Sequence, residues 1–245
     1  MRRLATLAVL TMLIPACGDD GDHRAETGRT ATSTITPAPR ESGTSLVARA
    51  TGPRITAVDA PGSDVEVATL PNPRPIAEGA EVELVLLVKE ERDGWLQVYL
   101  PVRPNGTTGW IREADVDLVG VAHKIVVNLA TFQLELFERD ELVLETRVGL
   151  GRDGEPTPPG TYFITELLQP PDPDGVYGPY AYGLSGFSDV HFDFGGGPGQ
   201  IGLHGTNDPS SIGGPASAGC IRLPNDVITE LARTLPLGTP VEIVA

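Results

Sequence analysis

Apolar and polar residues alternate along most of the chain, and this alternation predicts short β-strands. The strand-like runs between residues 64 and 150 are DVEVATL, EVELVLLVKE, WLQVYL, HKIVVNL, FQLELFE and ELVLETRVGL. Asp93-Gly94 and Arg139-Asp140 are expected to form tight turns between neighbouring strands. PPGTYFITELL (158–168) predicts a further strand, and PVEIVA (240–245) predicts the last one.

One helix is predicted between these last two strands. Asn225 is a suitable N-cap, and four apolar residues follow at helical spacing on one face: Val227, Ile228, Leu231 and Leu235. Pro236 and Gly238 then end the helix. The fold class expected is therefore mainly β with one or two short helices.

Changes in composition divide the chain into segments. Residues 18–53 are rich in Gly, Pro, Ser and Thr and poor in large apolar residues, so we expect a disordered linker. Residues 54–120 and 121–245 contain the strand-like runs and are expected to be two domains. Within the second, Pro170–Gly199 is rich in Gly and Pro and predicts a functional loop or flexible cover.

The N-terminus, MRRLATLAVLTMLIPAC, has the pattern of a secretory signal: two arginines, then a short apolar run from Leu4 to Ile14. Residues 14–17, Ile-Pro-Ala-Cys, resemble the bacterial lipobox, in which the cysteine is lipidated. We therefore expect a signal peptide over residues 1–17 and an exported lipoprotein, anchored in the membrane at Cys17 and facing the cell wall. The alternative is a secreted protein that loses Cys17 with its signal.

The net charge of −15 at pH 7 limits the classes of partner molecule that we expect. The acidic residues are spread along the chain and no basic stripe is present, so nucleic-acid binding is not expected. No second apolar span follows the signal, so membrane attachment is expected through the N-terminal lipid alone.

Cys220 is the one cysteine besides Cys17, and it could be a buried core residue, a metal ligand or a nucleophile. Gly219 allows a close backbone approach before it, and His204, 16 residues upstream, could take the thiol proton. Arg222, two residues beyond, could hold a substrate carboxylate. A zinc site would need His191, Asp193, His204 and Cys220, and no closely spaced ligand pair supports it.

The segments DGWLQVYLP and GTTGWIREADVDLV in the first domain resemble blocks of bacterial SH3-like domains. This resemblance implies a small β-barrel over residues 54–120. Trp95 and Trp110, the only tryptophans, would then pack in the barrel core or form a groove for peptide or glycan.

The segment IGLHGTNDPSSIGGPASAGCIRLPND (201–226) resembles the signature of the L,D-transpeptidase catalytic domain, the YkuD-like family. That signature runs from His-Gly-Thr through a Ser- and Gly-rich spacer to Ser-x-Gly-Cys-Ile-Arg-Leu-x-Asn. TPPGTYFI (157–164) resembles a second block of the family, and the resemblance extends over about 122–245. It implies a mixed β-sandwich fold for this domain.

The resemblance also implies a reaction. Cys220 would be the nucleophile that attacks the bond between a diamino acid and D-Ala in a peptidoglycan tetrapeptide stem. The acyl group would then pass to an amine of a second stem, giving a 3→3 cross-link. His204 would donate and accept the proton, the Gly205 carbonyl would orient it, and Gly219 would serve the oxyanion or the loop geometry.

Further expectations follow from the same resemblance. Arg222, Ser217, Thr206 and Asn225 would bind substrate, with Ser217 also hydrogen-bonding within its loop. No cofactor or metal is needed, and carbapenem-type β-lactams are expected to acylate Cys220. Two other functions stay open: an L,D-carboxypeptidase or hydrolase using the same site, and a non-catalytic wall-binding lipoprotein. Ala218 departs from the family pattern, where that position is commonly His, Lys or Arg.

Overall fold

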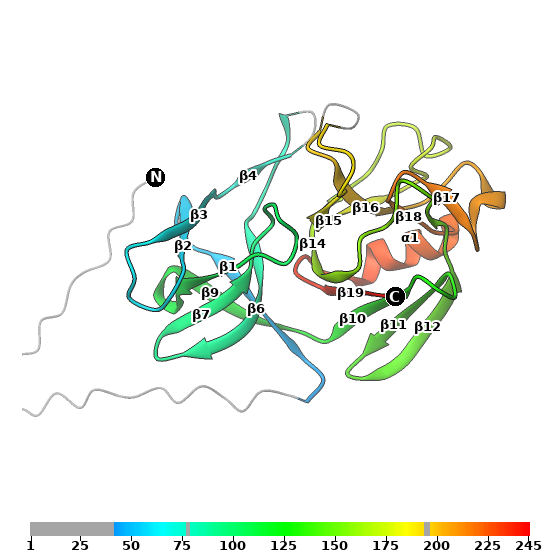
Figure 1. Cartoon of the computed structure of the whole chain (residues 1–245). Coiled ribbons are helices and arrows are strands. Elements are labelled where there is room, and N and C mark those ends of the chain that lie inside the picture. The colour runs from blue at the N-terminus through cyan, green and yellow to red at the C-terminus, as the bar shows by residue number, and fades with distance from the viewer. Residues whose placement is uncertain (1–41, 77–78, 194–196) are drawn as a thin grey trace, which may run out of the picture. The chain divides into compact units, whose positions relative to one another are not determined.

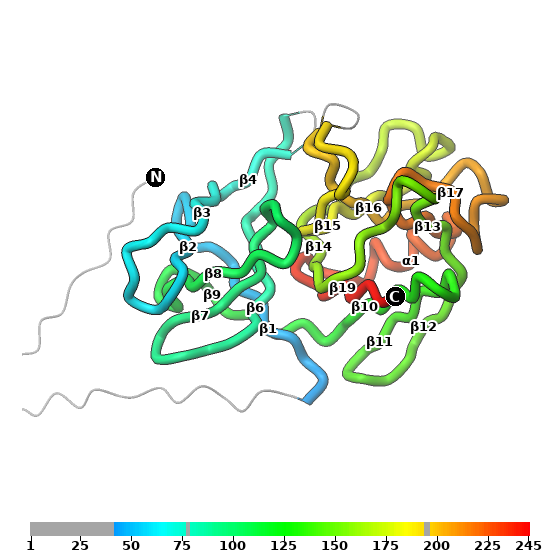
Figure 2. The backbone as a smooth tube through the Cα atoms, in the orientation of Figure 1, coloured from blue at the N-terminus to red at the C-terminus, as the bar shows by residue number. Residues whose placement is uncertain are grey.

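The computed structural model describes residues 42–76, 79–193 and 197–245, and this part of the chain is built mainly of β-strands (Figures 1 and 2). The predicted signal peptide, Cys17 and most of the predicted linker lie outside the described residues. Within the described residues, no helix is long and apolar enough to cross a membrane.

The first sheet has seven strands in the order β3-β2-β8-β7-β6-β1-β9. Their bounds are β1 Ser45–Ala50, β2 Arg54–Val58, β3 Glu66–Pro71, β6 Val85–Arg92, β7 Trp95–Tyr99, β8 Thr108–Arg112 and β9 Val116–Val121. A two-stranded ribbon, β4 (Arg74–Pro75) with β5 (Glu81–Val82), projects from it, and the 3₁₀ turn η2 (Glu113–Asp115) precedes β9. The predicted turn at Asp93-Gly94 is confirmed, since both residues have positive φ, as a type I′ turn requires.

The first strand corrects the predicted linker boundary at residue 53. β1 runs through SLVARA and pairs antiparallel with β6 on one side and β9 on the other. Val47 and Ala48 are buried in the core of this sheet. The sheet therefore begins at Ser45, because even this short apolar run is stabilised when both of its edges are hydrogen-bonded.

The second sheet has eight strands in the order β12-β11-β10-β19-β14-β15-β16-β18. Their bounds are β10 His123–Asn128, β11 Gln133–Glu138, β12 Glu141–Arg147, β14 Gly160–Leu168, β15 Ala181–Phe187, β16 Gln200–His204, β18 Ile221–Arg222 and β19 Pro240–Val244. β13 (Leu150–Gly151) pairs separately with β17 (Pro215–Ser217), and η3 is Pro209–Ser211. Arg139 and Asp140 both have positive φ, so the tight turn predicted between β11 and β12 is confirmed.

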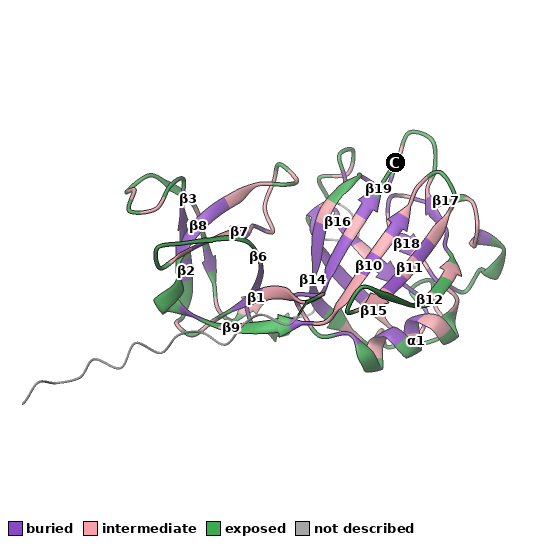
Figure 3. Cartoon of the chain, turned by 90° about the horizontal axis from the view of Figure 1, so that it is seen from below, coloured by how far each residue is buried: buried purple, intermediate pink, exposed green. Residues whose placement is uncertain are grey.

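The core of this second part lies between the sheet and the helix α1 (Asn225–Thr234), with buried residues along its central strands (Figure 3). Ile228 and Leu231 of α1 are fully buried, as predicted, and the Tyr182 hydroxyl donates to the Leu231 carbonyl at 2.8 Å. The expectation that Asn225 caps the helix is wrong. Pro224 occupies the N-cap position, and the Asn225 side chain bonds elsewhere.

A hydrophobic contact and an ion pair are among the interactions that join the first sheet to the second. Phe163 of β14 is fully buried in the hydrophobic core of the first sheet. Arg74 of β4 forms an ion pair with Glu166 of β14, whose side chain is almost completely buried. Side chains of the first and second sheets therefore pack against each other.

We predict that the Tyr182 hydroxyl stabilises the end of α1. It is buried and also lies 3.3 Å from the Leu235 carbonyl, and burial raises its pKa. Tyr182→Phe removes the donor without leaving a cavity, so the free energy of unfolding in urea should fall by about 1–2 kcal/mol. Tyr180→Phe, at a half-buried ring, is the control and should change it by less than about 0.5 kcal/mol. Equal effects of the two variants would contradict this assignment.

Candidate active site

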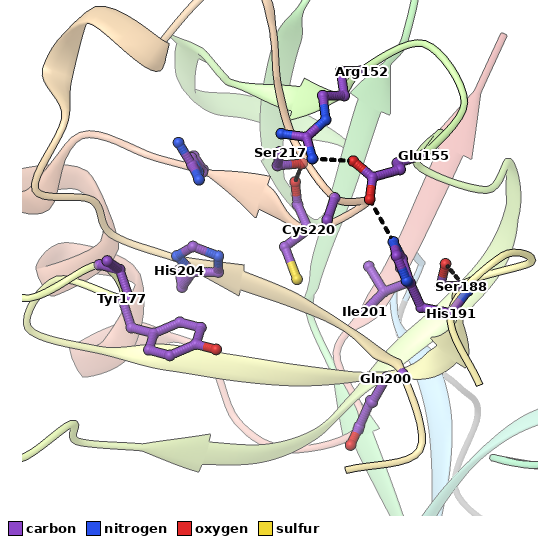
Figure 4. A pocket seen from close by; sticks show the side chains of 14 residues that line it. Arg152, Glu155, Tyr177, Ser188, His191, Gln200, Ile201, His204, Ser217 and Cys220 are labelled. Carbon is purple, nitrogen blue, oxygen red and sulfur yellow. Dashed lines mark hydrogen bonds and ion pairs between the residues drawn. The ribbon is translucent and has the colours of Figure 1, made fainter. Parts of the chain in front are cut away.

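The candidate site is built on two parallel neighbouring strands, β16 and β18. Leu203 pairs with Ile221, and His204 pairs with Arg222. Cys220 comes directly before β18, so this register brings the end of β16 beside the cysteine. The structure thus places His204 and Cys220, the candidate base and the candidate nucleophile, in one pocket of about 330 Å³ (Figure 4).

Gly202 lies beneath both side chains. Its N–H donates to the Cys220 Sγ at 3.3 Å. A Cβ atom at this position would lie 3.6 Å from Sγ and 3.6 Å from the Cδ2 of His204. The absence of a side chain here keeps the space between the thiol and the imidazole open.

The turn before Cys220 is held by side-chain hydrogen bonds. Ser217 Oγ donates to the Cys220 carbonyl at 2.6 Å and accepts from the Gly219 N–H at 3.1 Å. Gly219 has a φ of +119°, which favours glycine, and its carbonyl accepts from Thr157 Oγ1 at 2.9 Å. Because the Gly219 N–H is already engaged by Ser217, Gly219 contributes the geometry of the turn.

His204 is buried, with 4% of its surface exposed. Its Nδ1 lies 2.6 Å from the Gly205 carbonyl oxygen, which can only accept a hydrogen bond. The proton of the neutral ring is therefore on Nδ1, and Nε2 carries the lone pair. The ring of Tyr177 packs edge-on against the imidazole, with centroids 5.0 Å apart.

Burial keeps both groups uncharged. It lowers the pKa of His204 to about 4, with the Gly205 hydrogen bond opposing the shift and the charge of Arg222 adding to it. Burial also raises the pKa of Cys220, and the Gly202 N–H and Arg222 partly offset that rise. At neutral pH the resting site is a thiol beside a neutral imidazole, so a proton has to move before the sulfur can attack.

The other predicted residues have different placements. Arg222 lines the pocket. Thr206 does not: its N–H donates to the Asn225 Oδ1 at 2.8 Å, and its hydroxyl accepts from the Asp208 N–H at 3.0 Å. Thr206 and Asn225 therefore hold the loop after His204, which is a different role from the predicted contact with substrate.

The sequence did not predict which residues form the end of the pocket opposite His204. Arg152 and Glu155, between β13 and β14, and His191, between β15 and β16, line it together with Ala218. The prediction of one continuous loop over residues 170–199 is wrong, because β15 (Ala181–Phe187) crosses it as a buried strand paired with β14 and β16. His191 and His204 lie on opposite sides of Cys220 (Figure 4), so the zinc alternative does not gather its ligands. Among residues 42–76, 79–193 and 197–245, no three His, Cys, Asp or Glu side chains are grouped as a metal site.

Comparison with known proteins identifies the family of the part of the chain that carries this site. The family model of the L,D-transpeptidase catalytic domain, YkuD, matches residues 122–243. The YkuD protein of Bacillus licheniformis is 40% identical over 123 residues, which cover 50% of this chain and 66% of that protein. The L,D-transpeptidase-type YqjB protein of Bacillus subtilis is 32% identical over 49% of this chain and 69% of its own length.

A solved structure, Bd1075 of Bdellovibrio bacteriovorus, is 29% identical, with a TM-score of 0.40 over 50% of this chain and 47% of that one. The chain matches the YkuD proteins of Bacillus licheniformis and Bacillus subtilis over just under two thirds of their length. On the family model and the identity to the Bacillus proteins, the chain belongs to the YkuD family of L,D-transpeptidase catalytic domains.

The protonation state of His204 gives a pH prediction. Its pKa falls from 6.5 to about 4 on folding. Between these two pH values the ring is neutral in the folded protein but binds a proton in the unfolded chain. His204 therefore leaves the free energy of unfolding unchanged above pH 6.5 and lowers it as the pH falls from 6.5 toward 4. In an NMR titration, the His204 ring signals, assigned by their absence in His204→Asn, should not move until the pH is near 4. A midpoint near 6.5 would contradict the assignment.

Proposed function

We propose that this protein is a peptidoglycan L,D-transpeptidase with Cys220 as nucleophile and His204 as general base and acid. The observation that carries the proposal is the pairing of β16 with β18, which puts a buried neutral imidazole beside the only described cysteine thiol. The family membership of residues 122–243 supports the same chemistry.

The first half-reaction cleaves the donor stem. Nε2 of His204 takes the Cys220 proton, and Sγ attacks the carbonyl between the diamino acid and D-Ala. The Gly205 carbonyl stabilises the imidazolium through Nδ1–H. Since the Gly219 N–H is engaged by Ser217, we assign the N–H of Cys220 itself to the developing oxyanion. His204 then returns the proton to the nitrogen of D-Ala, which leaves, and a thioester remains.

The second half-reaction resolves the thioester. An amine of a second stem attacks the same carbonyl, the carbon–sulfur bond breaks, and the product is a 3→3 cross-link. Arg222, whose Nε is buried without a hydrogen-bond partner among the described residues, is the side chain we assign to a carboxylate of the donor stem. Thiol, imidazole and backbone groups suffice for this acyl transfer, so the mechanism uses no cofactor.

The wider setting is also part of the proposal. We propose a lipoprotein exported to the cell envelope and anchored through Cys17, with residues 45–121 as an SH3-like domain and residues 122–245 as the catalytic domain. The seven-stranded first sheet, in which Trp110 is buried and Trp95 is half-buried, supports the assignment of the first domain as SH3-like. Carbapenem-type β-lactams are the expected acylating inhibitors, because their strained carbonyl offers the same electrophile.

The test is product analysis with a defined donor and acceptor. Residues 42–245 are incubated with a tetrapeptide stem and an amine-bearing acceptor stem, and products are identified by mass. The wild type should release D-Ala and form the amide between the stems, whereas Cys220→Ala should lose D-Ala release by about 10³-fold or more.

A tripeptide product alone would favour the L,D-carboxypeptidase alternative. Full activity of Cys220→Ala, with its free energy of unfolding unchanged, would contradict the assigned nucleophile. If the wild type released no D-Ala but was retained on isolated cell wall, the non-catalytic alternative would take its place.

A further inference from the structure

A loop of the first sheet contacts one wall of the pocket that holds Cys220. The segments 187–191 and 198–201, which we call the pocket wall, lie on the side of Cys220 away from His204 (Figure 4). They line the pocket with Ser188, His191, Gly199, Gln200 and Ile201. Two side chains of the loop between β7 and β8, residues 100–107, form hydrogen bonds with this wall. The first sheet therefore takes part in building the pocket.

Arg103 of this loop donates to three backbone carbonyls of the pocket wall. Its Nη1 donates to the Ser188 carbonyl at 2.7 Å, and its Nη2 donates to those of His191 and Pro198, at 2.9 and 3.0 Å. These carbonyls belong to both segments of the wall, so one guanidinium links the two segments. A planar group with five donors suits this position, whereas an ammonium group is a point charge with a different geometry.

Asn105 holds the adjoining residue of the wall, Phe187, in the manner of a neighbouring strand. Its Nδ2 donates to the Phe187 carbonyl at 2.7 Å, and its Oδ1 accepts from the Phe187 N–H at 2.9 Å. The Arg103 guanidinium also packs over the Phe187 ring, 5.0 Å from its centroid. Phe187 is the last residue of β15 and pairs with Gln200 of β16. The loop thus fixes the end of the hairpin that carries the wall.

The wall is packed too closely to absorb a shift. The Ser188 N–H donates to the Gly199 carbonyl at 2.8 Å. Gly199 has a φ of +72°, and a Cβ atom there would lie 1.9 Å from the His191 carbonyl oxygen, which is one of the acceptors of Arg103. Ile201 is buried and would lie 3.2 Å from a Cβ atom on Gly219, in the turn before Cys220. The wall therefore connects the loop of the first sheet to the edge of the reactive site.

The reacting pair is held by other contacts. The pairing of β16 with β18 sets the level of His204, whose Nδ1 is bonded to the Gly205 carbonyl. Gly202 and Ser217 hold Cys220 through its sulfur and its carbonyl. All these groups belong to the second sheet and its loops. A change in the loop of the first sheet should therefore move the wall and leave the thiol beside the imidazole.

We propose that Arg103 and Asn105 are positioning residues for the donor stem: they hold the pocket wall in the shape that receives the peptide. This inference rests on the proposed function. Arg222, assigned to a carboxylate of the stem, is level with His204, so a stem bound there and acylating Cys220 reaches the wall on the other side. A misplacement of about 1 Å is enough to weaken such contacts strongly. The first sheet thereby contributes to the affinity for substrate.

The experiment measures single-turnover D-Ala release by residues 42–245 at increasing concentrations of the tetrapeptide stem. Arg103→Ala and Asn105→Ala should each raise the half-saturating concentration by about 10-fold or more and change the maximal rate by less than about threefold. Arg103→Lys should not restore the wild-type value, because it lacks the planar fork. Arg49→Ala is the matched control, since this exposed arginine of β1 pairs with Glu83, and it should change neither quantity.

A second readout tests whether the reacting pair is unchanged. Cys220 is the only cysteine in residues 42–245, so its alkylation by iodoacetamide reports on the thiol with a reagent too small to need the wall. The alkylation rates of the wild type, Arg103→Ala and Asn105→Ala should agree within about twofold. A change in either direction in both variants would show that the loop supports the reacting pair or the fold as a whole, and would overturn the inference.

An unchanged half-saturating concentration in both alanine variants, or a loss confined to the maximal rate, would also overturn it, while D-Ala release by the wild type still supported the proposed function. Absence of D-Ala release from the wild type would instead count against the proposed function itself.

Discussion

The parallel pairing of β16 with β18 is the interaction on which the rest of the site depends. It sets His204 and Arg222 at the same level of two adjacent strands and leaves Cys220 just outside the ladder. Further hydrogen bonds fix β18, which has only two residues. The Leu223 N–H donates to the His204 carbonyl, and Arg222 exchanges two backbone hydrogen bonds with Gly149. A shift in this register would separate the thiol from the imidazole and would also move the buried Ile221 out of the core.

Burial is the second constraint, and it acts on charge. A thiol and an imidazole side by side in a low-dielectric pocket are held in their neutral forms, because desolvation disfavours both ions. The Gly205 carbonyl, the Gly202 N–H and the Arg222 guanidinium are arranged so that each stabilises one partner after proton transfer. The resting site therefore holds a thiol and a neutral imidazole, and the proposed mechanism requires a proton to pass between them before the sulfur attacks.

The sequence predicted the local features well and the long-range ones less well. The strands, the turns at Asp93 and Arg139 and the buried face of α1 follow from periodicity, and His204 and Cys220 follow from their motif. Strand β1 was missed because its six residues follow a linker-like composition and are stabilised only by pairing with β6 and β9. Asn225 has a side chain suited to capping a helix, but its Oδ1 accepts a hydrogen bond from the N–H of Thr206 in another loop. Tyr177 and Glu155 reach the site from segments without a local pattern, so only the tertiary structure reveals them.

The most direct measurement is the intact mass of residues 42–245 after exposure to a carbapenem, with the wild type, Cys220→Ala and His204→Asn compared. The account predicts one stoichiometric adduct on the wild type, none on Cys220→Ala, and acylation slowed by about 10²-fold or more in His204→Asn, since the thiol would lack its base. An adduct on Cys220→Ala, or equal acylation rates for His204→Asn and the wild type, would contradict the claim that this buried pair is the reactive centre.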